Sequence, residues 1–343
     1  MKSKMILRIL SVILVLVLAM SLAACGSNNQ TSSGTENQAS IDGQAGKDVS
    51  NEEYVLINNM TTLPFFVNHD NKALELAGKE LGVKTSVVGP ADNNIQAMIE
   101  AFEQTIARKP AGIMVIGWNE SALTPLINKA IDAGIPTITV DADAPKSKRL
   151  AFIGTNWYEL GLKLGDATVK ATNGKGKVAM LGLIGLDNMD QAYKGFKEVI
   201  AKNSEMQIVT LEDDKADEAE AAKITSAILQ KYPDLAALVG FDAAAAGIGM
   251  GIKEAGKTGQ VKLVMNNAEP QQLQLVKDGV AQYCIGQKRE LFTYYGLRLL
   301  YDMNHSPIKF STDDKKAGIT PLPVNVETGF IEVNKNNIDL FFK

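Results

Sequence analysis

The chain has 343 residues, of which 45% are hydrophobic and 22% are charged, and its formal net charge is −4. This is an ordinary globular composition, and the length fits two domains of usual size. The charge balance excludes the basic footprint of a nucleic-acid-binding protein, so we expect no nucleic-acid partner.

The N-terminal segment has the pattern of a secretory signal peptide. Three basic residues precede a short apolar run at 9–20, and the small residues of "LAAC" end at Cys25. This order is typical of a cleaved signal, and its end resembles a bacterial lipobox. The apolar run is short for a membrane span. We therefore expect residues 1–24 to be removed and Cys25 to carry a lipid that anchors the protein at the outer face of the cytoplasmic membrane.

Residues 26–53 are rich in Ser, Asn, Gln, Gly and Thr and have no apolar period. Such a segment cannot bury enough apolar surface to offset the entropy of ordering. We expect residues 25–53 to form the lipidated cysteine and a flexible tether. The remaining cysteine, Cys284, lies in an apolar run and should be a buried hydrophobic side chain.

From Tyr54 onward, short apolar runs alternate with helix-length segments. The segments 66–81 and 93–107 carry apolar residues three and four apart, which predicts amphipathic helices. The alternation predicts parallel sheets with helices on both faces, and two sheets of five or six strands fit the chain better than one. The predicted strands are 54–58, 83–88, 111–116, 136–140, 150–153, 177–182, 206–211, 235–239, 261–265 and 281–285.

Ligands of open α/β sheets bind beyond the carboxyl ends of the strands, so the residues after each run are the candidates. They are aromatic, acidic or amide side chains, with little Lys or Arg and no His. The candidate ligand-binding residues are Phe65, Phe66, Trp118, Asp141, Asp143, Trp157, Asn188, Asp190, Asp242, Asn267 and Gln287.

These side chains suit a sugar. Aromatic rings can stack on the C–H faces of a sugar, while carboxylates and amides bond its hydroxyl groups. The stretch "TLPFF" is informative here, because adjacent helical residues do not share a face. If Phe66 packs into the core, Phe65 is left for another partner, and we expect one or both to stack on a sugar.

Enzyme signatures are missing from the sequence. There are two histidines and no HExxH, P-loop or G-x-S-x-G motif. Asp141 and Asp143 could suggest a glycosidase, but residues two apart on an extended segment point to opposite faces, so they make a poor acid–base pair. We expect no catalysis, no cofactor and no metal.

The body from about residue 54 onward resembles the type 1 periplasmic binding proteins of the ribose/galactose-binding kind, the sugar receptors of bacterial ABC importers. The resemblance rests on "LPFFVNHDNKALELAGKELGV", "GIPTITVDADAP", "FIGTNWYELG", "YPDLAALVGFDAAAAGIGMGIKEAG", "LQLVKDGVAQYCIGQK" and "VETGFIEVNKNNID". It implies a monomer that closes on a sugar and docks on an ABC permease. It also implies two doubly wound parallel-sheet lobes joined by a three-segment hinge, with an N-terminal lobe of 54–155 plus 288–325, a C-terminal lobe of 156–287 plus 326–343, and crossings near Thr155, Gln287 and Asn325.

By this resemblance Phe65 and Phe66 match the stacking pair of the family and Asp141 its hydroxyl-binding aspartate. Asp242, Asn267 and Gln287 match polar positions after later strands.

Three departures from the resemblance put ribose in doubt. Ala142 and Ala192 stand where many members carry Arg, and Ala216 stands near a usual aromatic. Without these guanidinium groups, the ligand site would be wider and would have fewer hydrogen-bond donors. The motifs are closer to the glucose/xylose-binding branch, so an aldopyranose is favoured. A short oligosaccharide such as a cello-oligomer, or a sensor role for a membrane kinase, are the alternatives.

Overall fold

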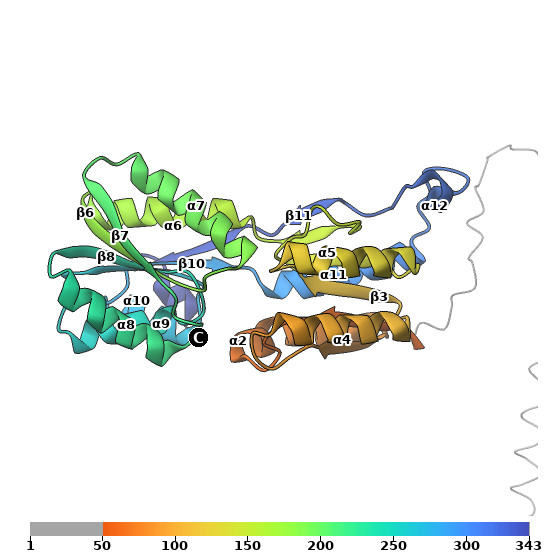
Figure 1. Ribbon diagram of the computed structural model, residues 1–343, viewed down its shortest axis with the longest axis horizontal. Helices are drawn as coiled ribbons and strands as arrows, with labels where there is room; N and C mark the ends of the chain where they lie inside the picture. Colours follow the sequence, from red (N-terminus) through yellow and green to blue (C-terminus); the bar gives the residue numbers. More distant parts are fainter. Residues whose placement is uncertain (1–50, 343) are drawn as a thin grey trace, which may run out of the picture. The chain divides into compact units, whose positions relative to one another are not determined.

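The computed structural model describes residues 51–342, so the expected signal peptide, Cys25 and most of the tether lie outside the described residues. Among residues 51–342, no helix combines the length and the apolar composition needed to cross a membrane. The described chain forms two six-stranded sheets, each accompanied by helices (Figure 1). We call them, with their helices, the first lobe and the second lobe.

The first lobe is built on an all-parallel sheet in the order β11-β5-β4-β3-β1-β2. Its strands are β1 (Glu53–Ile57), β2 (Lys84–Val88), β3 (Gly112–Ile116), β4 (Thr137–Asp141), β5 (Phe152–Gly154) and β11 (Asn325–Glu327). Its helices are α2 (Pro64–Phe66), the π-helical turn η2 (Val67–Asn71), α3 (Lys72–Leu81), α4 (Ile95–Arg108), α5 (Glu120–Asp132), α11 (Glu290–His305) and α12 (Asp314–Ala317).

The second lobe repeats this topology in the order β12-β10-β9-β8-β6-β7, except that β12 runs antiparallel to β10. Its strands are β6 (Gly176–Leu181), β7 (Met206–Glu212), β8 (Leu235–Gly240), β9 (Lys262–Asn266), β10 (Tyr283–Gln287) and β12 (Phe330–Asn334). Its helices are α6 (Trp157–Thr172), α7 (Asp187–Ala201), α8 (Glu218–Lys231), α9 (Ala245–Glu254), α10 (Pro270–Lys277) and the 3-10 turn η3 (Ile338–Phe341).

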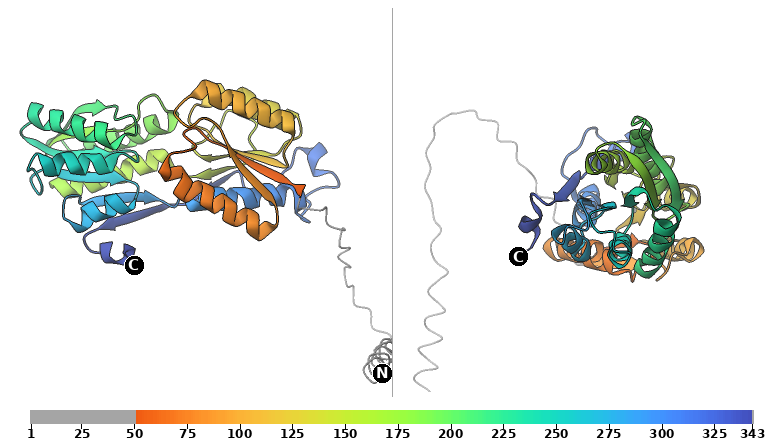
Figure 2. Two further views of the ribbon diagram at one scale, coloured as in Figure 1. Left: turned by 90° about the horizontal axis from the view of Figure 1, so that it is seen from below. Right: turned by 90° about the vertical axis from the view of Figure 1, so that its left-hand side faces the viewer.

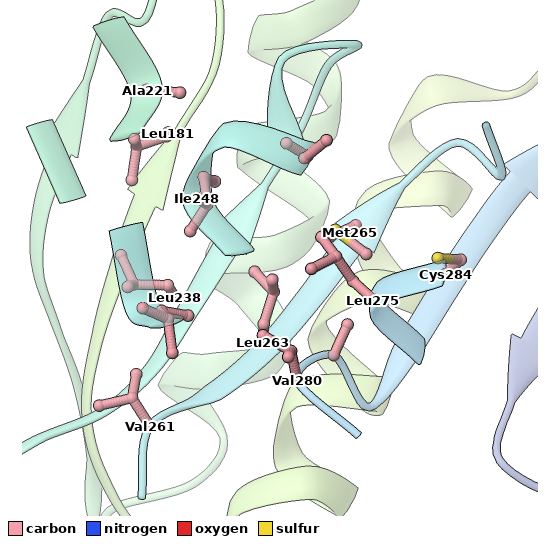
Figure 3. Close-up of a cluster of buried hydrophobic side chains, with 14 of the residues drawn as sticks. Leu181, Ala221, Leu238, Ile248, Val261, Leu263, Met265, Leu275, Val280 and Cys284 are labelled. Carbon is pink, nitrogen blue, oxygen red and sulfur yellow. The ribbon is translucent and has the colours of Figure 1, made fainter. Parts of the chain in front are cut away.

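Each sheet is buried on both faces, which explains the continuous apolar runs of the sequence. All five residues of β3 and of β4 are buried. Figure 3 shows one core of the second lobe, where Leu238 and Leu263 of the sheet pack with Ile248 of α9 and Leu275 of α10. Cys284 lies in this core as the sequence predicts, and burial raises the pKa of its thiol to about 12.

The prediction of two doubly wound sheets is confirmed, and all ten predicted strands are present with ends within two residues of the expected positions. β11 and β12 were not predicted. Both are partly exposed, so neither carries a buried apolar run. The expected helix 66–81 begins earlier, at Pro64, because proline suits the first helical position. The turn η2 then interrupts it.

The chain changes lobes three times in the described residues, and Figure 2 shows its blue C-terminal part contributing to both lobes. The first crossing lies between β5 and α6, and the second between β10 and α11, close to the expected positions. The third lies between Glu327 and Phe330. It falls later than the expected Asn325 because residues 325–327 pair with β5 of the first sheet.

Candidate functional site

A cavity lies at the carboxyl ends of both sheets, where residues of the two lobes face each other. The empty space between its lining residues is about 440 Å³, which includes open solvent at the mouth. Nine of the eleven candidate residues line it, namely Phe65, Phe66, Trp118, Asp141, Trp157, Asn188, Asp242, Asn267 and Gln287.

The first lobe contributes an aromatic wall. Phe66 is 2% exposed and packs on Trp118 with ring centroids 5.4 Å apart, whereas Phe65 is only half-buried and meets Phe66 edge to face, also at 5.4 Å. The helical start at Pro64 places the two side chains on different faces. Phe66 therefore belongs to the core, and Phe65 presents ring surface to the cavity.

A buried ion-pair network supports this wall. Arg289, at the second crossing, donates from Nε to Asp70 Oδ2 at 2.8 Å and from Nη2 to Asp70 Oδ1 at 2.9 Å. Its Nη2 also donates to Asp141 Oδ2 at 3.2 Å, and Nη1 lies 3.1 Å from Asp141 Oδ1. Burial alone would lower the pKa of Arg289, but Asp141 and Asp70 outweigh it and raise that pKa. The guanidinium stays charged and binds two carboxylates.

The π-helical turn is what brings Asp70 inside. η2 follows directly on the phenylalanine pair, and Asp70 within it is 0% exposed. The Arg289 guanidinium lies 4.7 Å from the ring centroid of Phe65 and 4.9 Å from that of Phe66, distances typical of cation–π contacts. π-turns are frequent at functional sites, and this one couples the aromatic wall to the second crossing.

His69 forms an ionic contact between the lobes. Its Nε2 donates to Glu269 Oε1 of the second lobe at 2.8 Å, and its Nδ1 donates to Glu290 Oε1 at 2.6 Å. Two carboxylate acceptors require a proton on each ring nitrogen. Burial lowers the pKa of His69, but the hydrogen bonds to Glu269 and Glu290 outweigh it and raise the pKa to about 9. His69 is therefore an imidazolium at neutral pH.

Other contacts between the lobes surround the cavity. Trp157 Nε1 of the second lobe donates to the Asp141 carbonyl oxygen at 2.8 Å. The Asp187 backbone N–H donates to the Trp118 carbonyl oxygen at 3.1 Å, and the Glu120 N–H donates to Asp187 Oδ2 at 2.7 Å. The lobes thus meet through specific hydrogen bonds, and the cleft between them is closed.

Amide and carboxylate groups complete the lining. Both polar atoms of the Gln287 side chain, and Oδ1 of Asn188, are buried without a hydrogen-bond partner in the described residues. Asp242 is 8% exposed and accepts the backbone N–H groups of Leu183 and Ala244. Buried polar atoms are rarely left unpaired in folded proteins, so those of Gln287 and Asn188 are free to pair with water or with a polar ligand.

Two candidates lie away from this cavity. Asp143 accepts hydrogen bonds from Arg149 Nη2 at 2.6 Å and Thr139 Oγ1 at 2.7 Å, which ties its carboxylate to the first lobe. Asp190 is exposed on α7. Asp143 lies beyond the end of β4, and its carboxylate pairs with Arg149 whereas that of Asp141 pairs with Arg289, so the two do not form an acid–base pair.

Sequence reasoning missed the charged network. The sequence predicted few hydrogen-bond donors at the cavity, because Ala142 and Ala192 stand where relatives carry arginine. This prediction is wrong, because Arg289 brings a guanidinium group to the cavity from another part of the chain. The available signal was its position two residues after Gln287, directly past a strand end. Asp70 and His69 gave no comparable signal, because both lay inside an expected helix.

Comparisons with known proteins agree with this fold. The sequence profile described as a periplasmic binding protein domain matches residues 54–305. The D-allose-binding periplasmic protein of Escherichia coli K12 is 24% identical over 265 residues, covering 74% of this chain and 85% of its own.

Two solved structures extend the likeness. AraP, an arabinose binding protein from Geobacillus stearothermophilus, is 30% identical with a TM-score of 0.70, covering 85% of this chain and 100% of its own. A sugar-binding protein of a sugar ABC transporter from Bacillus halodurans is 28% identical with a TM-score of 0.75 and the same coverage.

Replacing Arg289 by Met should destabilise the protein strongly. The change leaves Asp70 and Asp141 buried without their cation, and breaking a buried pair costs about 3–5 kcal/mol. Urea unfolding would measure this loss. The control is Arg298→Met on α11, where a partly exposed arginine pairs with Glu80 and the expected cost is below about 1 kcal/mol. Equal losses for the two variants would contradict the network.

His69 should make stability depend on pH. Its folded pKa is about 9 against about 6.5 in the unfolded chain, so its contribution is fully present below about pH 6.5 and is lost as the pH rises through about 9. Thermal unfolding should therefore show a smaller loss over this window for His69→Gln than for wild type. His305→Gln, which alters a contact with Glu52 inside the first lobe, is the control. Identical slopes for wild type and His69→Gln would exclude the contact.

Proposed function

Because the chain belongs to the periplasmic binding protein family, we propose that it is an extracytoplasmic receptor that captures a sugar between its lobes and delivers it to an ABC importer. The observation that carries this proposal is the cavity itself, in which an aromatic wall faces buried carboxylate and amide groups. Its expected lipid at Cys25 would tether it to the membrane, and we propose that it acts as a monomer.

An aldopyranose of the glucose or xylose kind is the favoured ligand. The relatives named above for D-allose and arabinose support a monosaccharide. The cello-oligomer was considered because missing arginines would widen the site. Arg289 lines the cavity and supplies a guanidinium group there, which weakens this reason.

Each wall has a distinct part in this proposal. Phe65 stacks on one face of the ring, and Asp141 and Asp242 accept hydrogen bonds from hydroxyl groups on opposite sides. Gln287, Asn188 and Asn267 supply amide groups that can both donate and accept. A site of this kind rejects molecules that lack hydroxyl groups, because its buried polar atoms would remain unpaired.

Closure of the cleft is part of binding. The contacts of His69 with Glu269, and of Trp157 with the Asp141 carbonyl, join the two lobes and break when the lobes separate. A ligand shifts the protein toward the closed form only if it binds that form more tightly. A sugar that contacts both walls at once binds the closed form more tightly than the open form. We propose that this closed form docks on the permease.

A thermal-shift screen of the purified protein tests the function. D-glucose, D-xylose, D-ribose, D-allose, L-arabinose and cellobiose are compared, with calorimetry on each response. A sugar at a hundred times its Kd should stabilise the protein by about 2.7 kcal/mol. A response to one or more monosaccharides supports the proposal, whereas a response to cellobiose alone favours the oligosaccharide alternative. No response to any of these sugars would contradict the function.

Two substitutions locate the binding site. Phe65→Ala removes the stacking surface and should weaken the responding sugar about tenfold, while Asp242→Ala should weaken it about ten- to a hundredfold. Isothermal titration calorimetry measures both. Phe310→Ala is the control, because this phenylalanine is 63% exposed and does not line the cavity. Unchanged affinity in both site variants would place the ligand elsewhere.

A further inference from the structure

Asp242 has the surroundings of an ionised carboxylate. It lies between β8 and α9 and lines the cavity from the second lobe. Its Oδ2 accepts the backbone N–H of Leu183 at 3.1 Å, and its Oδ1 accepts that of Ala244 at 2.9 Å. Hydrogen bonds from backbone N–H groups favour the charged form of a carboxyl group.

Asp214 has different surroundings. It follows β7, is 0% exposed, and its carboxyl group lies within hydrogen-bonding distance of that of Asp242. Its Oδ1 accepts the backbone N–H of Ala216 at 3.1 Å. Its Oδ2 is buried and has no N–H or other fixed donor among the described residues.

Among the described residues, no cation forms an ion pair with either carboxyl group, and Lys215, the next residue after Asp214, is exposed. Burial raises the pKa of Asp242 as well as that of Asp214, and the charge of Asp213 on the same loop adds to both effects. Tyr193 donates its own O–H to the Leu183 carbonyl oxygen at 2.6 Å. Two adjacent buried carboxyl groups without a cation cannot both ionise, so they share one proton.

The hydrogen bonds locate that proton. Both oxygens of Asp242 already accept backbone N–H groups, whereas Asp214 Oδ2 lacks a donor. A proton on Asp214 Oδ2 turns this atom into a donor and satisfies it through Asp242. The opposite placement would leave a buried carboxylate oxygen on Asp214 with no other donor.

We propose that Asp214 is a positioning residue that stays protonated at Oδ2, donates to Asp242, and so fixes the second-lobe wall as a single negative charge that accepts hydroxyl groups of an uncharged sugar. This inference rests on the proposed function for its ligand. It assigns Asp214 a role through Asp242, since Asp214 does not itself line the cavity.

The charge of the cavity then selects the class of sugar. Asp242 carries one negative charge on the second-lobe wall, and Asp141 carries another on the first-lobe wall. Arg289, the cation at the cavity, is occupied by two carboxylates. A sugar acid or sugar phosphate would meet negative charge on both sides without a free cation, so uncharged sugars are preferred.

The titration of the pair provides a test that needs no ligand. Burial and then the charge of Asp242 raise the pKa of Asp214 to about 9, against about 3.9 for an unfolded aspartate. The folded protein holds a proton that the unfolded chain has lost, so stability falls as the pH rises from about 4 to about 9. Asp214→Asn keeps a donor toward Asp242 but removes this titration.

The experiment compares melting temperatures of wild type, Asp214→Asn and the control Asp166→Asn, which removes the same charge at an exposed position on α6 of the second lobe. The difference between Asp214→Asn and wild type should grow in favour of the variant as the pH rises toward about 9, while Asp166→Asn keeps the wild-type slope. Infrared spectra at neutral pH should show a protonated carboxylic acid in wild type that is missing from Asp214→Asn. Parallel melting curves, or no such band, would overturn the proposal.

Calorimetry with D-glucose, D-xylose, D-ribose, D-allose and D-glucuronate tests the part that concerns binding. Asp214→Ala should weaken the tightest of the four uncharged sugars about tenfold, and Asp214→Asn should recover most of that loss. D-glucuronate bound as tightly as that sugar would overturn the charge argument. If none of the four sugars binds, the proposed function fails, and the ligand-free melting curves still decide whether Asp214 and Asp242 share a proton.

Discussion

The ion pairs of one buried arginine, Arg289, hold the candidate site together. Arg289 is 3% exposed and lies where the chain passes from the second lobe back to the first. Its two carboxylate partners come from distant segments, Asp70 from the π-turn and Asp141 from the end of β4. Because an unpaired charge at such depth would cost several kcal/mol, the three segments are held in one arrangement. The aromatic wall is fixed with them, since Phe65 and Phe66 pack against the guanidinium group.

This arrangement also leaves a particular set of groups for a ligand. The positive charge of Arg289 is already matched, so the cavity offers ring surface, carboxylate oxygens and amide atoms without partners. Such a surface suits the hydroxyl groups of the proposed sugar better than ionic groups. The contact of His69 with Glu269 and Glu290 adds a bridge between the lobes at the edge of the same network. The groups that face the cavity and the contacts that join the two lobes therefore belong to one network of polar side chains.

The sequence predicted the fold well because its signals were local. Runs such as Ile113–Ile116 are buried on both faces, and their alternation with amphipathic helices leaves few topologies. The candidate residues followed from the rule that ligands meet the ends of strands, which depends on topology and not on side-chain detail. For the same reason the rule also selected Asp143, which follows a strand but turns toward Arg149.

The missed features depended on contacts between residues far apart in the chain. Asp70 and Arg289 are 219 positions apart, and neither position alone predicts a buried ion pair. The π-turn that places Asp70 inside differs from a regular helix only locally, so the apolar period of 66–81 could not reveal it. The proton shared by Asp214 and Asp242 needs the positions of backbone donors, which only the folded chain supplies.

We propose that a sugar ring binds between the two lobes against Phe65. A crystal structure of the protein grown with the monosaccharide that stabilises it most is the measurement that decides this. We expect one ring stacked on Phe65, with hydroxyl groups hydrogen-bonded to Asp141 and Asp242 and to the amide of Gln287. A sugar bound outside this cavity, or one inside it that leaves both carboxylates and Gln287 without contact, would rule out this binding mode.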